Sequence, residues 1–464
     1  MRGVADDEIV VHDEIVAEDE LLIEEQISTM AVDTPARIAI LGAGPIGVET
    51  ALYARFLGYD VDLYERQEVA ANLLRWGHVR MFSPFSWNSS PLGLAALAAQ
   101  DETYRPPNAD ELLTGREWAT RYVRPLAETD LLVDFIHPRT EVLAISKGGL
   151  LKTEFVGGSE REEAFFRLLL RKDGQELHAA ADVVIDCTGV YGNHNWAGDG
   201  GMPAPGEKEA GAKDPDGRIE YAIPDVLGLE RTKYATGHTL LIGNGYSAAT
   251  TAVAFRELLE SSPRASLTWL SRCAPSDDPL PRIAADALIE RDRLCAEANR
   301  MAKHAPERCR YLPGASLMRI ERQPRADEAS KSIAADSMLV TVQRYADGEE
   351  EQFVVDRIVA NVGYRPNLQM LSELQVHWCY ASDGPMKLAA ALMGSSGDCM
   401  SQASTGAASL MNPEPHFYVL GSKSYGRKSN FLFRTGLQQI RDLFTIIGDR
   451  EALDLYAGTR QLPR

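Results

Sequence analysis

The sequence predicts an α/β protein made of two Rossmann-like domains of the three-layer ββα type, with the second domain inserted into the first. Three observations favour this fold class. Two glycine-rich turns each follow a short apolar run and precede a helical stretch. Each turn is followed downstream by a hairpin pattern and a further apolar run that leads to a glycine. The chain, at 464 residues, is also too long for one ordinary core.

The first glycine-rich turn follows the apolar run 37–41, which is typical of a buried parallel strand. The first glycine allows a tight turn, the second lets the backbone approach a pyrophosphate, and the third lets the following helix pack closely on the strand. A helix is expected over 48–57, and its N-terminus offers free N–H groups to an anion. The residues of this turn proposed to bind a dinucleotide are Gly42, Gly44, Pro45, Ile46 and Gly47.

The strand expected next, over 60–64, ends in Glu65 and Arg66. A carboxylate at this point, 23 residues after Gly42, can accept hydrogen bonds from ribose hydroxyl groups. A hairpin is expected over 165–177, and the apolar run that follows it ends in Thr188 and Gly189, where the chain must turn beside the nucleotide. These four residues complete the first predicted site.

The second glycine-rich turn follows the apolar run 238–242 and precedes a helix expected to end near residue 259. Its binding residues are predicted to be Gly243, Gly245, Tyr246, Ser247 and Ala248, with alanine in place of the third glycine. The next strand, over 266–270, ends in Ser271 and Arg272 without a carboxylate. Serine and arginine can bind a 2′-phosphate, which favours NADPH over NADH. The alternative is that Arg272 is a solvated side chain at a strand end.

A second hairpin is expected over 338–355, and the apolar run after it leads to Gly363 and Tyr364. The residues just before this glycine, Asn361 and Val362, differ from the commoner Ala-Thr, so this turn is assigned by its position in the repeat. Both glycine-rich turns are therefore followed by the same order of elements, which indicates a degenerate internal repeat.

The order of these motifs resembles that of the two-dinucleotide-binding-domain flavoproteins, which include thioredoxin reductase, flavin-containing monooxygenases and N-hydroxylating monooxygenases. The resemblance covers about residues 35–450. It implies that FAD binds the first domain, that NADPH binds the inserted domain, and that hydride passes to the flavin. Segments 76–88 and 416–441 are also similar to a poorly characterised bacterial group of flavoprotein monooxygenases, some of which accompany arsenic-resistance genes.

The resemblance also implies a role for the C-terminal segment. Gly421 and Ser422 follow the apolar run 417–420, where related flavoproteins place a Gly-Asp pair on the ribityl chain. Serine departs from that pattern and would bind the ribityl oxygen more weakly. A helix beginning near Thr435 would direct its positive end toward the flavin and stabilise the anionic reduced form.

The expected organisation has five parts. They are an acidic, disordered extension (1–34), the first part of the FAD-binding domain (35–228), the inserted NADPH-binding domain (229–354), the second part of the FAD-binding domain (355–450) and a C-terminal tail (451–464). Residues 1–33 hold eleven acidic side chains against one basic one and supply −10 of the formal charge of −19. This charge predicts a solvated segment, with a docked amphipathic helix as the alternative. The glycine- and proline-rich stretch 192–228 is expected to be an irregular crossover.

Composition excludes several classes of function. Acidity argues against a nucleic-acid-binding protein, which needs clustered Lys and Arg. The acidic start argues against a secretory signal, and no apolar run is long enough to span a membrane. The six cysteines are scattered, which predicts neither a zinc site nor a redox dithiol and fits a cytoplasmic enzyme with reduced thiols. A homodimer is possible by analogy with the relatives.

Three functions follow from this reading. The first is a flavoprotein monooxygenase that uses FAD, NADPH and O2 to oxygenate a small nucleophile through a C4a-(hydro)peroxyflavin. The aromatic segment 82–87 would wall the flavin from water. The second is an NAD(P)H-dependent reductase of a disulfide or quinone, with Cys399 as the candidate thiol. The third is a non-catalytic redox sensor, against which the second nucleotide site argues. His78, Arg80 and His194 are the polar side chains expected nearest the flavin, but no catalytic residue is assigned.

Overall fold

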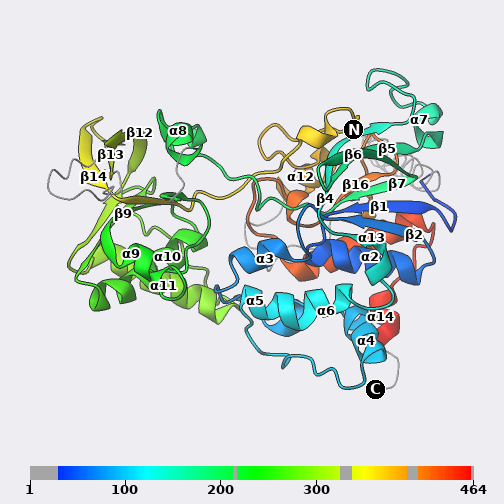
Figure 1. The fold of residues 1–464 in the computed structure, drawn as a ribbon, viewed down its shortest axis with the longest axis horizontal. Helices are drawn as coiled ribbons and strands as arrows, with labels where there is room; N and C mark the ends of the chain where they lie inside the picture. The colour runs from blue at the N-terminus through cyan, green and yellow to red at the C-terminus, as the bar shows by residue number, and fades with distance from the viewer. Residues whose placement is uncertain (1–29, 213–216, 324–336, 394–405, 461–464) are drawn as a thin grey trace, which may run out of the picture.

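The computed structural model describes residues 30–212, 217–323, 337–393 and 406–460 of the chain. Two α/β domains lie side by side and are joined by two extended crossings of the chain (Figure 1). Within the described part of the chain, no helix combines the length and the apolar character needed to cross a membrane.

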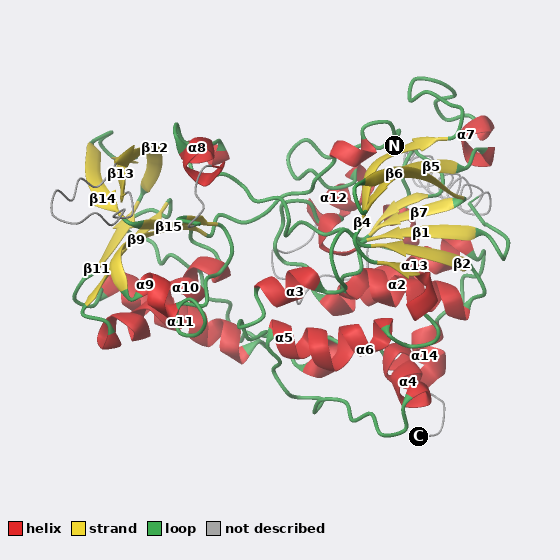
Figure 2. Ribbon diagram, viewed as in Figure 1, coloured by secondary structure: helices red, strands yellow, loops and turns green. Residues whose placement is uncertain are grey.

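The first domain contains a five-stranded parallel sheet. The strands lie in the order β16 (Phe417–Val419), β7 (Val183–Asp186), β1 (Arg37–Leu41), β2 (Asp60–Tyr64) and β3 (Ile136–His137). Helices α2 (Pro45–Phe56) and α13 (Phe433–Ile447) cover one face, as Figure 2 shows. The other face carries an antiparallel sheet of β4 (Thr140–Lys147), β5 (Phe166–Lys172) and β6 (Gln175–Ala181). This three-layer ββα arrangement confirms the predicted fold class.

Apolar periodicity explains these layers. The strand β1 is buried along its last four residues and α2 is buried almost throughout, which fits a central strand and its covering helix. Strand β5 alternates buried and exposed side chains, because only one of its faces packs on the parallel sheet. The hairpin predicted around Asp173 and Gly174 is present, and both residues have positive φ angles of 51° and 78°.

A further group of helices packs on the helical side of the first domain. It consists of α3 (Ala71–Arg75), α4 (Pro91–Gln100), α5 (Gly115–Trp118), α6 (Arg124–Ala127) and α14 (Leu455–Arg460). Helix α14 packs against α4, and its Tyr456 is buried. Part of the expected C-terminal tail is therefore an ordinary packed helix. Residues 461–464 lie outside the described residues.

The second domain repeats the same architecture. Its parallel sheet has the order β11 (Cys309–Pro313), β10 (Arg264–Ser271), β9 (Thr236–Ile242), β15 (Arg357–Ala360) and β8 (Ile219–Glu220). Helices α9 (Arg231–Tyr234), α10 (Tyr246–Ser261) and α11 (Ile289–Lys303) cover one face. Strands β12 (Ala315–Gln323), β13 (Ser337–Arg344) and β14 (Glu350–Val355) form the antiparallel layer.

The inserted domain is larger than the expected range 229–354, and both boundaries need correction. Strand β15 pairs with β9, and β8 pairs with β15, so both strands belong to the second sheet. Ala197 and Ala204 pack in the same core. The stretch 192–228, expected to be irregular, thus contributes α8 (Glu207–Ala212) and β8 to the second domain. Elements this short are interrupted by Gly and Pro and carry no periodic signal in sequence.

The two crossings pair with each other. His194 forms an antiparallel bridge with Tyr364. The N–H of Asn195 donates to the carbonyl of Gly363 at 3.0 Å, and the N–H of Arg365 donates to the carbonyl of Asn193 at 2.9 Å. The domains are therefore connected by a short two-stranded ribbon.

The last residues of the expected N-terminal extension are packed. Met30 is buried against Met411 and Ile446, and the N–H of Val32 donates to the carbonyl of Ile447 at 2.9 Å. The prediction of a solvated segment therefore does not apply to residues 30–34. Residues 1–29 lie outside the described residues.

Candidate functional site

The first glycine turn is shaped by close contacts with strand β7. Gly42 has a φ of +92°, and a Cβ there would lie 3.0 Å from the Cys187 carbonyl oxygen. A Cβ on Gly47 would lie 1.9 Å from the Gly42 carbonyl oxygen. Gly44 differs from both, because a Cβ there would meet no protein atom within 4 Å. Gly44 caps helix α2 and faces open space at its N-terminus.

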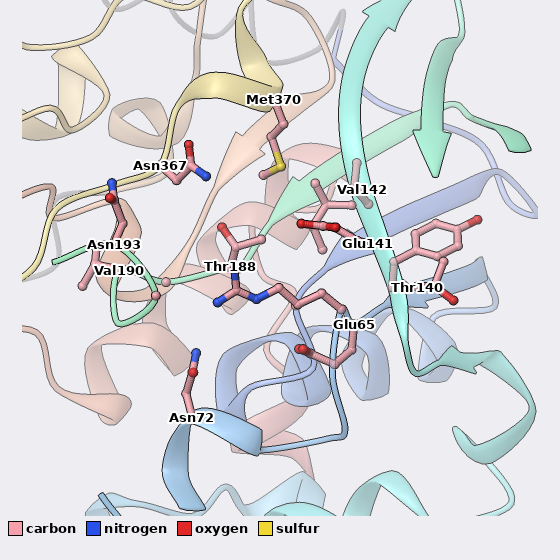
Figure 3. Close-up of a pocket in the computed structure, with 16 residues that line it drawn as sticks. Glu65, Asn72, Thr140, Glu141, Val142, Thr188, Val190, Asn193, Asn367 and Met370 are labelled. Carbon is pink, nitrogen blue, oxygen red and sulfur yellow. The ribbon is translucent and has the colours of Figure 1, made fainter. Parts of the chain in front are cut away.

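Two adjoining cavities of about 400 and 110 Å³ lie at this turn. They meet at the carboxyl ends of β1, β2 and β7, where a dinucleotide binds in this kind of sheet. Figure 3 shows residues that line the smaller cavity, with Asn367 and Met370 toward the top of the view, Glu65 and Asn72 toward the bottom, and Thr188 between them. Residues that line both cavities are Gly42, Glu65, Asn72, Thr188, Gly189 and Val190.

Glu65 is held at the wall of both cavities by the backbone. Its Oε2 accepts a hydrogen bond from the Ala43 N–H at 2.9 Å, and its Oε1 accepts one from the Gln67 N–H at 2.8 Å. Each oxygen has further lone pairs for a ligand. Arg66 lines the smaller cavity and lies against Gly192, where a Cβ would be 2.2 Å from its Nη2. No sequence pattern indicates this role of Gly192.

Aromatic and aliphatic side chains wall the larger cavity. The Trp118 ring meets the Phe433 ring edge to face at 5.4 Å, and the Trp118 indole N–H donates to the Asn88 carbonyl at 2.8 Å. Helix α13 begins at Phe433, two residues before the predicted start, and its N-terminus adjoins the cavity. The apolar side chains that line the cavity include Ile46, Leu73, Trp76, Met81, Trp118, Phe431, Leu432 and Phe433.

The prediction that aromatic residues of 82–87 wall this cavity is wrong. Phe85 is buried in the core against Tyr122, and Trp87 lies beneath the guanidinium of Arg434. Phe82 contacts Tyr246 of the second domain, at 5.9 Å between ring centroids. The short 3-10 turn Phe85–Trp87 directs these side chains away from the cavity, which a sequence pattern does not reveal.

Two turns close the far side of the larger cavity. Gly189 and Gly421 have positive φ angles of 65° and 74°, which explains glycine at both positions. A Cβ on Gly189 would lie 3.2 Å from the Ser422 Oγ, so the turns touch. The structure thus brings together predicted residues from four distant segments. Those that line the larger cavity are Gly42, Gly44, Pro45, Ile46, Glu65, Thr188, Gly189, Gly421 and Ser422.

The second glycine turn has matching geometry. Gly243 has a φ of +140°, and a Cβ there would lie 2.3 Å from the Asn361 carbonyl oxygen. Gly245 caps helix α10, and a Cβ there would meet no protein atom within 4 Å. Tyr246 begins the helix, and Ala248 is buried beneath it.

Two buried side chains near this turn, Asn361 and Trp269, make hydrogen bonds that were not foreseen. The Asn361 Oδ1 accepts a hydrogen bond from the Thr251 hydroxyl at 2.7 Å, and its amide donates to the Ala222 carbonyl at 3.0 Å. These bonds explain why Asn361 departs from the commoner alanine. The Trp269 indole N–H donates to the Gly243 carbonyl at 2.8 Å and supports the turn from below.

Ser271 and Arg272 lie beside this turn. The N–H of Gly243 donates to the carbonyl of Leu270 at 3.0 Å, which places the end of β10 next to the glycines. Ser271 is buried, and its Oγ accepts the Cys273 N–H at 3.1 Å. Arg272 is exposed, so it is the cationic side chain that this strand end presents to solvent.

A third cavity of about 230 Å³ lies between the two domains. Trp76 and Tyr191 line both this cavity and the larger cavity of the first domain, while Ser247 belongs to the first turn of α10. The rings of Tyr191 and Tyr364 stack at 4.6 Å. The cavity also includes Tyr221, Ile223, Asn361, Gly363 and Tyr364.

The three polar residues expected near the flavin are elsewhere. His194 stacks on Tyr221 in the interdomain ribbon, and the Arg80 guanidinium donates to the Leu112 carbonyl at 2.8 Å. Neither these two residues nor His78 lines any of the three cavities. Among the described residues, no group of three or more His, Cys, Asp or Glu side chains could hold a metal ion.

Comparison with known proteins identifies the fold. No protein-family model and no curated protein matches the chain. A bacillithiol disulfide reductase from Bacillus cereus shares 17% identity, with 90% of this chain and 99% of the other covered and a TM-score of 0.61. A cadaverine monooxygenase from Erwinia amylovora, solved with FAD, shares 11% identity over 91% and 96% of the chains at a TM-score of 0.58.

The third comparison is an ornithine N-hydroxylase from Kutzneria sp. 744, solved with reduced FAD, NADP+ and L-ornithine. It shares 14% identity over 90% of this chain and 100% of the other, at a TM-score of 0.52. The fold is that of the two-dinucleotide-binding-domain flavoproteins. Reductases and monooxygenases both have this fold, so the fold does not distinguish between them.

Two thiols of the described residues have different surroundings. Cys187 lines the larger cavity, but burial raises its pKa, and its Sγ lies 3.8 Å from the Thr50 hydroxyl. Hydrogen bonds from Ser382 and the Ala381 N–H lower the pKa of Cys379, which lines none of the cavities described above. Cys399, the candidate thiol of the reductase hypothesis, lies outside the described residues.

Proposed function

We propose that the protein is an FAD-dependent, NADPH-using oxidoreductase and, within that class, a monooxygenase that oxygenates a small nucleophilic substrate. One observation carries the proposal. Each domain has a glycine turn whose middle glycine faces open space at a helix N-terminus, and two mainly apolar cavities that share Trp76 and Tyr191 lie between the domains' turns. Structures with this fold have been solved with FAD and with NADP+.

The residues of the first domain fit FAD. The open space at Gly44 and the N-terminus of α2 suit a pyrophosphate, since a helix N-terminus attracts an anion. The Glu65 carboxylate is oriented for ribose hydroxyls, and the smaller cavity beyond it would take the adenine. Ser422 would bond the ribityl chain, and the aromatic walls of the larger cavity suit a flat ring system.

The residues of the second domain fit NADPH in the same way. Gly245 and the N-terminus of α10 would bind its pyrophosphate. Arg272 and Ser271 would hold the 2′-phosphate at the end of β10. From there the nicotinamide would enter the interdomain cavity, which adjoins the flavin cavity at Trp76 and Tyr191.

FAD, when bound, supplies the redox chemistry, accepting hydride from NADPH and reacting with O2. The chain's own residues set the surroundings of that chemistry. Trp118, Phe433 and Met81 exclude water from the larger cavity, which limits unproductive release of hydrogen peroxide. The N-terminus of α13, at the cavity wall, would supply a positive partial charge to stabilise negative charge on a bound, reduced cofactor.

Within the described residues, the thiol at the larger cavity is poorly suited to attack a disulfide, which supports oxygen as the electron acceptor. A disulfide reductase of this type needs a nucleophilic thiolate at the flavin, and thiolate formation follows a low pKa. Among the described residues, Cys187 is the thiol that lines the larger cavity, and burial raises its pKa. A quinone acceptor needs no thiol and is tested separately below.

The experiment is anaerobic reduction of the FAD-loaded protein by NADPH and by NADH, followed by addition of oxygen with panels of amines, thioethers and inorganic nucleophiles. We expect faster reduction by NADPH, a transient flavin spectrum unlike the oxidised or reduced form, and oxygenated product for one substrate class. The Cys187→Ala and Cys379→Ser variants should turn over like wild type.

Two results would overturn the proposal. Failure of both nicotinamides to reduce the flavin would remove the oxidoreductase assignment. Formation of hydrogen peroxide alone with every nucleophile, together with rapid turnover of a disulfide or quinone, would replace the monooxygenase by a reductase.

A further inference from the structure

A fully buried ion pair lies directly behind the two turns that close the larger cavity. The Lys423 Nζ lies 2.5 Å from the Asp186 Oδ2, and both side chains are completely buried. Asp186 ends strand β7, and Lys423 follows strand β16, so the pair joins segments 237 residues apart. Asp186 immediately precedes the turn Cys187–Gly189, and Lys423 ends the turn Gly421–Lys423; residues of both turns line the larger cavity, where the proposed function places the cofactor.

We propose that Asp186 and Lys423 are positioning residues that hold the Thr188-Gly189 and Gly421-Ser422 turns in one fixed arrangement, and thereby determine FAD affinity and the reduction potential of the flavin. The inference rests on the proposed binding of FAD in the first domain. Neither Asp186 nor Lys423 lines the two cavities, so each would act on the cofactor through the turns.

The contacts of Asp186 support its role in holding the Thr188-Gly189 turn. Its Oδ1 accepts hydrogen bonds from the Thr188 N–H at 3.0 Å and from the Thr188 hydroxyl at 2.6 Å. The Lys423 ammonium also donates to the Thr188 Oγ1, at 3.1 Å. Thr188 is therefore bound by both members of the pair, and its position sets that of Gly189, whose φ of +65° a flexible segment would not maintain.

The contacts around Lys423 fix the second turn. The Ser424 hydroxyl donates to the Gly421 carbonyl at 2.7 Å. Gln439 of helix α13 accepts the Gly421 N–H at 2.9 Å and donates to the Ser424 Oγ at 2.9 Å. The turn is thus held by α13 on one side and by the ion pair on the other, and Ser422 is the residue of this turn that reaches the cavity with Gly421.

Stability alone does not explain a charged pair at this place. Removing two charges from water is costly, and an apolar pair of similar volume often supports a core equally well. The strands that carry the pair are otherwise apolar here, since Val419, the register partner of Asp186 on β16, and Val184 on β7 belong to a buried apolar core. The ion pair instead restricts the geometry of the two turns. A charge-assisted hydrogen-bond network allows one arrangement of its donors and acceptors, whereas apolar packing allows several.

The test separates positioning from folding with a double substitution. In Lys423→Met alone, a buried carboxylate loses its counter-charge, so both thermal stability and FAD affinity should fall. In the double variant Asp186→Leu with Lys423→Met, apolar packing replaces the pair, and the melting temperature of the apoprotein should return near that of wild type. FAD should nevertheless dissociate about tenfold more readily, as expected for lost hydrogen bonds to charged groups, and the two-electron potential should shift.

The structure offers a matched control in the same domain. Arg161 and Glu414 form another fully buried ion pair, with N–O distances of 3.0 and 2.6 Å, and neither residue lines the cavities. The variant Arg161→Met with Glu414→Leu should leave the FAD dissociation constant and the potential of the folded protein unchanged. Asp186→Asn, which keeps the shape of the side chain, provides a second variant if the double variant does not fold.

The outcomes are distinct. Wild-type affinity and potential in both the double variant and Asp186→Asn would overturn the inference, as would an equal loss of affinity in the Arg161 and Glu414 control. A wild-type protein that binds no FAD would overturn the proposed function instead, because that result does not depend on the ion pair.

Discussion

The substitution Gly44→Ala should weaken FAD binding without destabilising the fold. Gly44 has φ −77° and ψ −179°, which alanine adopts without strain, and its Cβ would meet no protein atom within 4 Å. The apoprotein should therefore keep its stability to within about 0.5 kcal/mol. The added methyl group would instead occupy the space where a pyrophosphate must approach the backbone.

The expected loss of affinity follows from the size of that group. Forcing one extra carbon into a close-packed contact costs about 1–3 kcal/mol. At 25 °C this corresponds to roughly a 5- to 150-fold rise in the FAD dissociation constant. NADPH binding to the second domain should be unaffected, since that turn lies in a separate sheet.

Alanine substitutions at two further glycines serve as references for the Gly44→Ala variant. Gly47→Ala would place a Cβ 1.9 Å from the Gly42 carbonyl oxygen, so this variant should lose about 3 kcal/mol or more of unfolding free energy even without cofactor. Gly245→Ala, in open space at the second turn, should leave FAD bound and weaken NADPH binding.

The assay is isothermal titration of each apoprotein with FAD and NADPH, together with urea unfolding of the same samples. If Gly44→Ala binds FAD as tightly as wild type, the pyrophosphate does not approach this turn and the assignment of the first site is refuted. If Gly44→Ala destabilises the apoprotein as much as Gly47→Ala, the space at Gly44 is not open.

Three other predictions concern single side chains. Arg272→Ala should raise the KM for NADPH about tenfold and change the KM for NADH by less than about twofold, measured by steady-state flavin reduction; equal effects on both nucleotides would contradict a 2′-phosphate contact. Phe433→Leu should cost under about 1.5 kcal/mol of stability, yet raise the share of NADPH oxidation that yields hydrogen peroxide, because it opens the apolar wall; unchanged coupling would show that this wall does not exclude water. Burial raises the pKa of Glu49 to about 7 from 4.5, so its contribution to stability is present below pH 4.5 and is lost as the pH rises through 7. In Glu49→Gln the side chain cannot ionise. The difference in unfolding free energy between this variant and wild type, measured in urea, should therefore shift in favour of the variant by about 2 kcal/mol from pH 5 to pH 8. A difference that does not depend on pH would show that Glu49 is already ionised in the folded protein.

Local sequence signals predicted much of the fold. The strands β1 and β2 begin and end as expected, and both hairpins turn at the predicted Asp-Gly pairs. These features depend on a few neighbouring residues, such as glycines with positive φ or a run of apolar side chains. The boundaries of the inserted domain could not be predicted in this way, because β8 is two residues long and owes its place to pairing with β15.

In the candidate site, too, the local features could be predicted from the sequence and the features that depend on long-range packing could not. The conformations of the glycine turns, the position of Glu65 and the Thr188-Gly189 turn could be predicted because each depends on one strand end and the residues next to it. The cavity walls could not, since Trp118 and Phe433 meet only when α5 and α13 pack together. The aromatic segment 82–87 misled for a related reason: composition indicates apolar side chains but not the direction in which a turn points them.

The sequence by itself thus determined a duplicated α/β architecture with two nucleotide-type turns, because backbone geometry at glycine and strand periodicity are local properties. Only the tertiary structure decided which side chains enclose the cavity and how the turns are held. The Asp186–Lys423 pair shows this most clearly, since two charged residues 237 positions apart carry no mutual signal along the chain. Their pairing follows from β7 and β16 lying next to each other in the sheet, where burial makes each charge require the other.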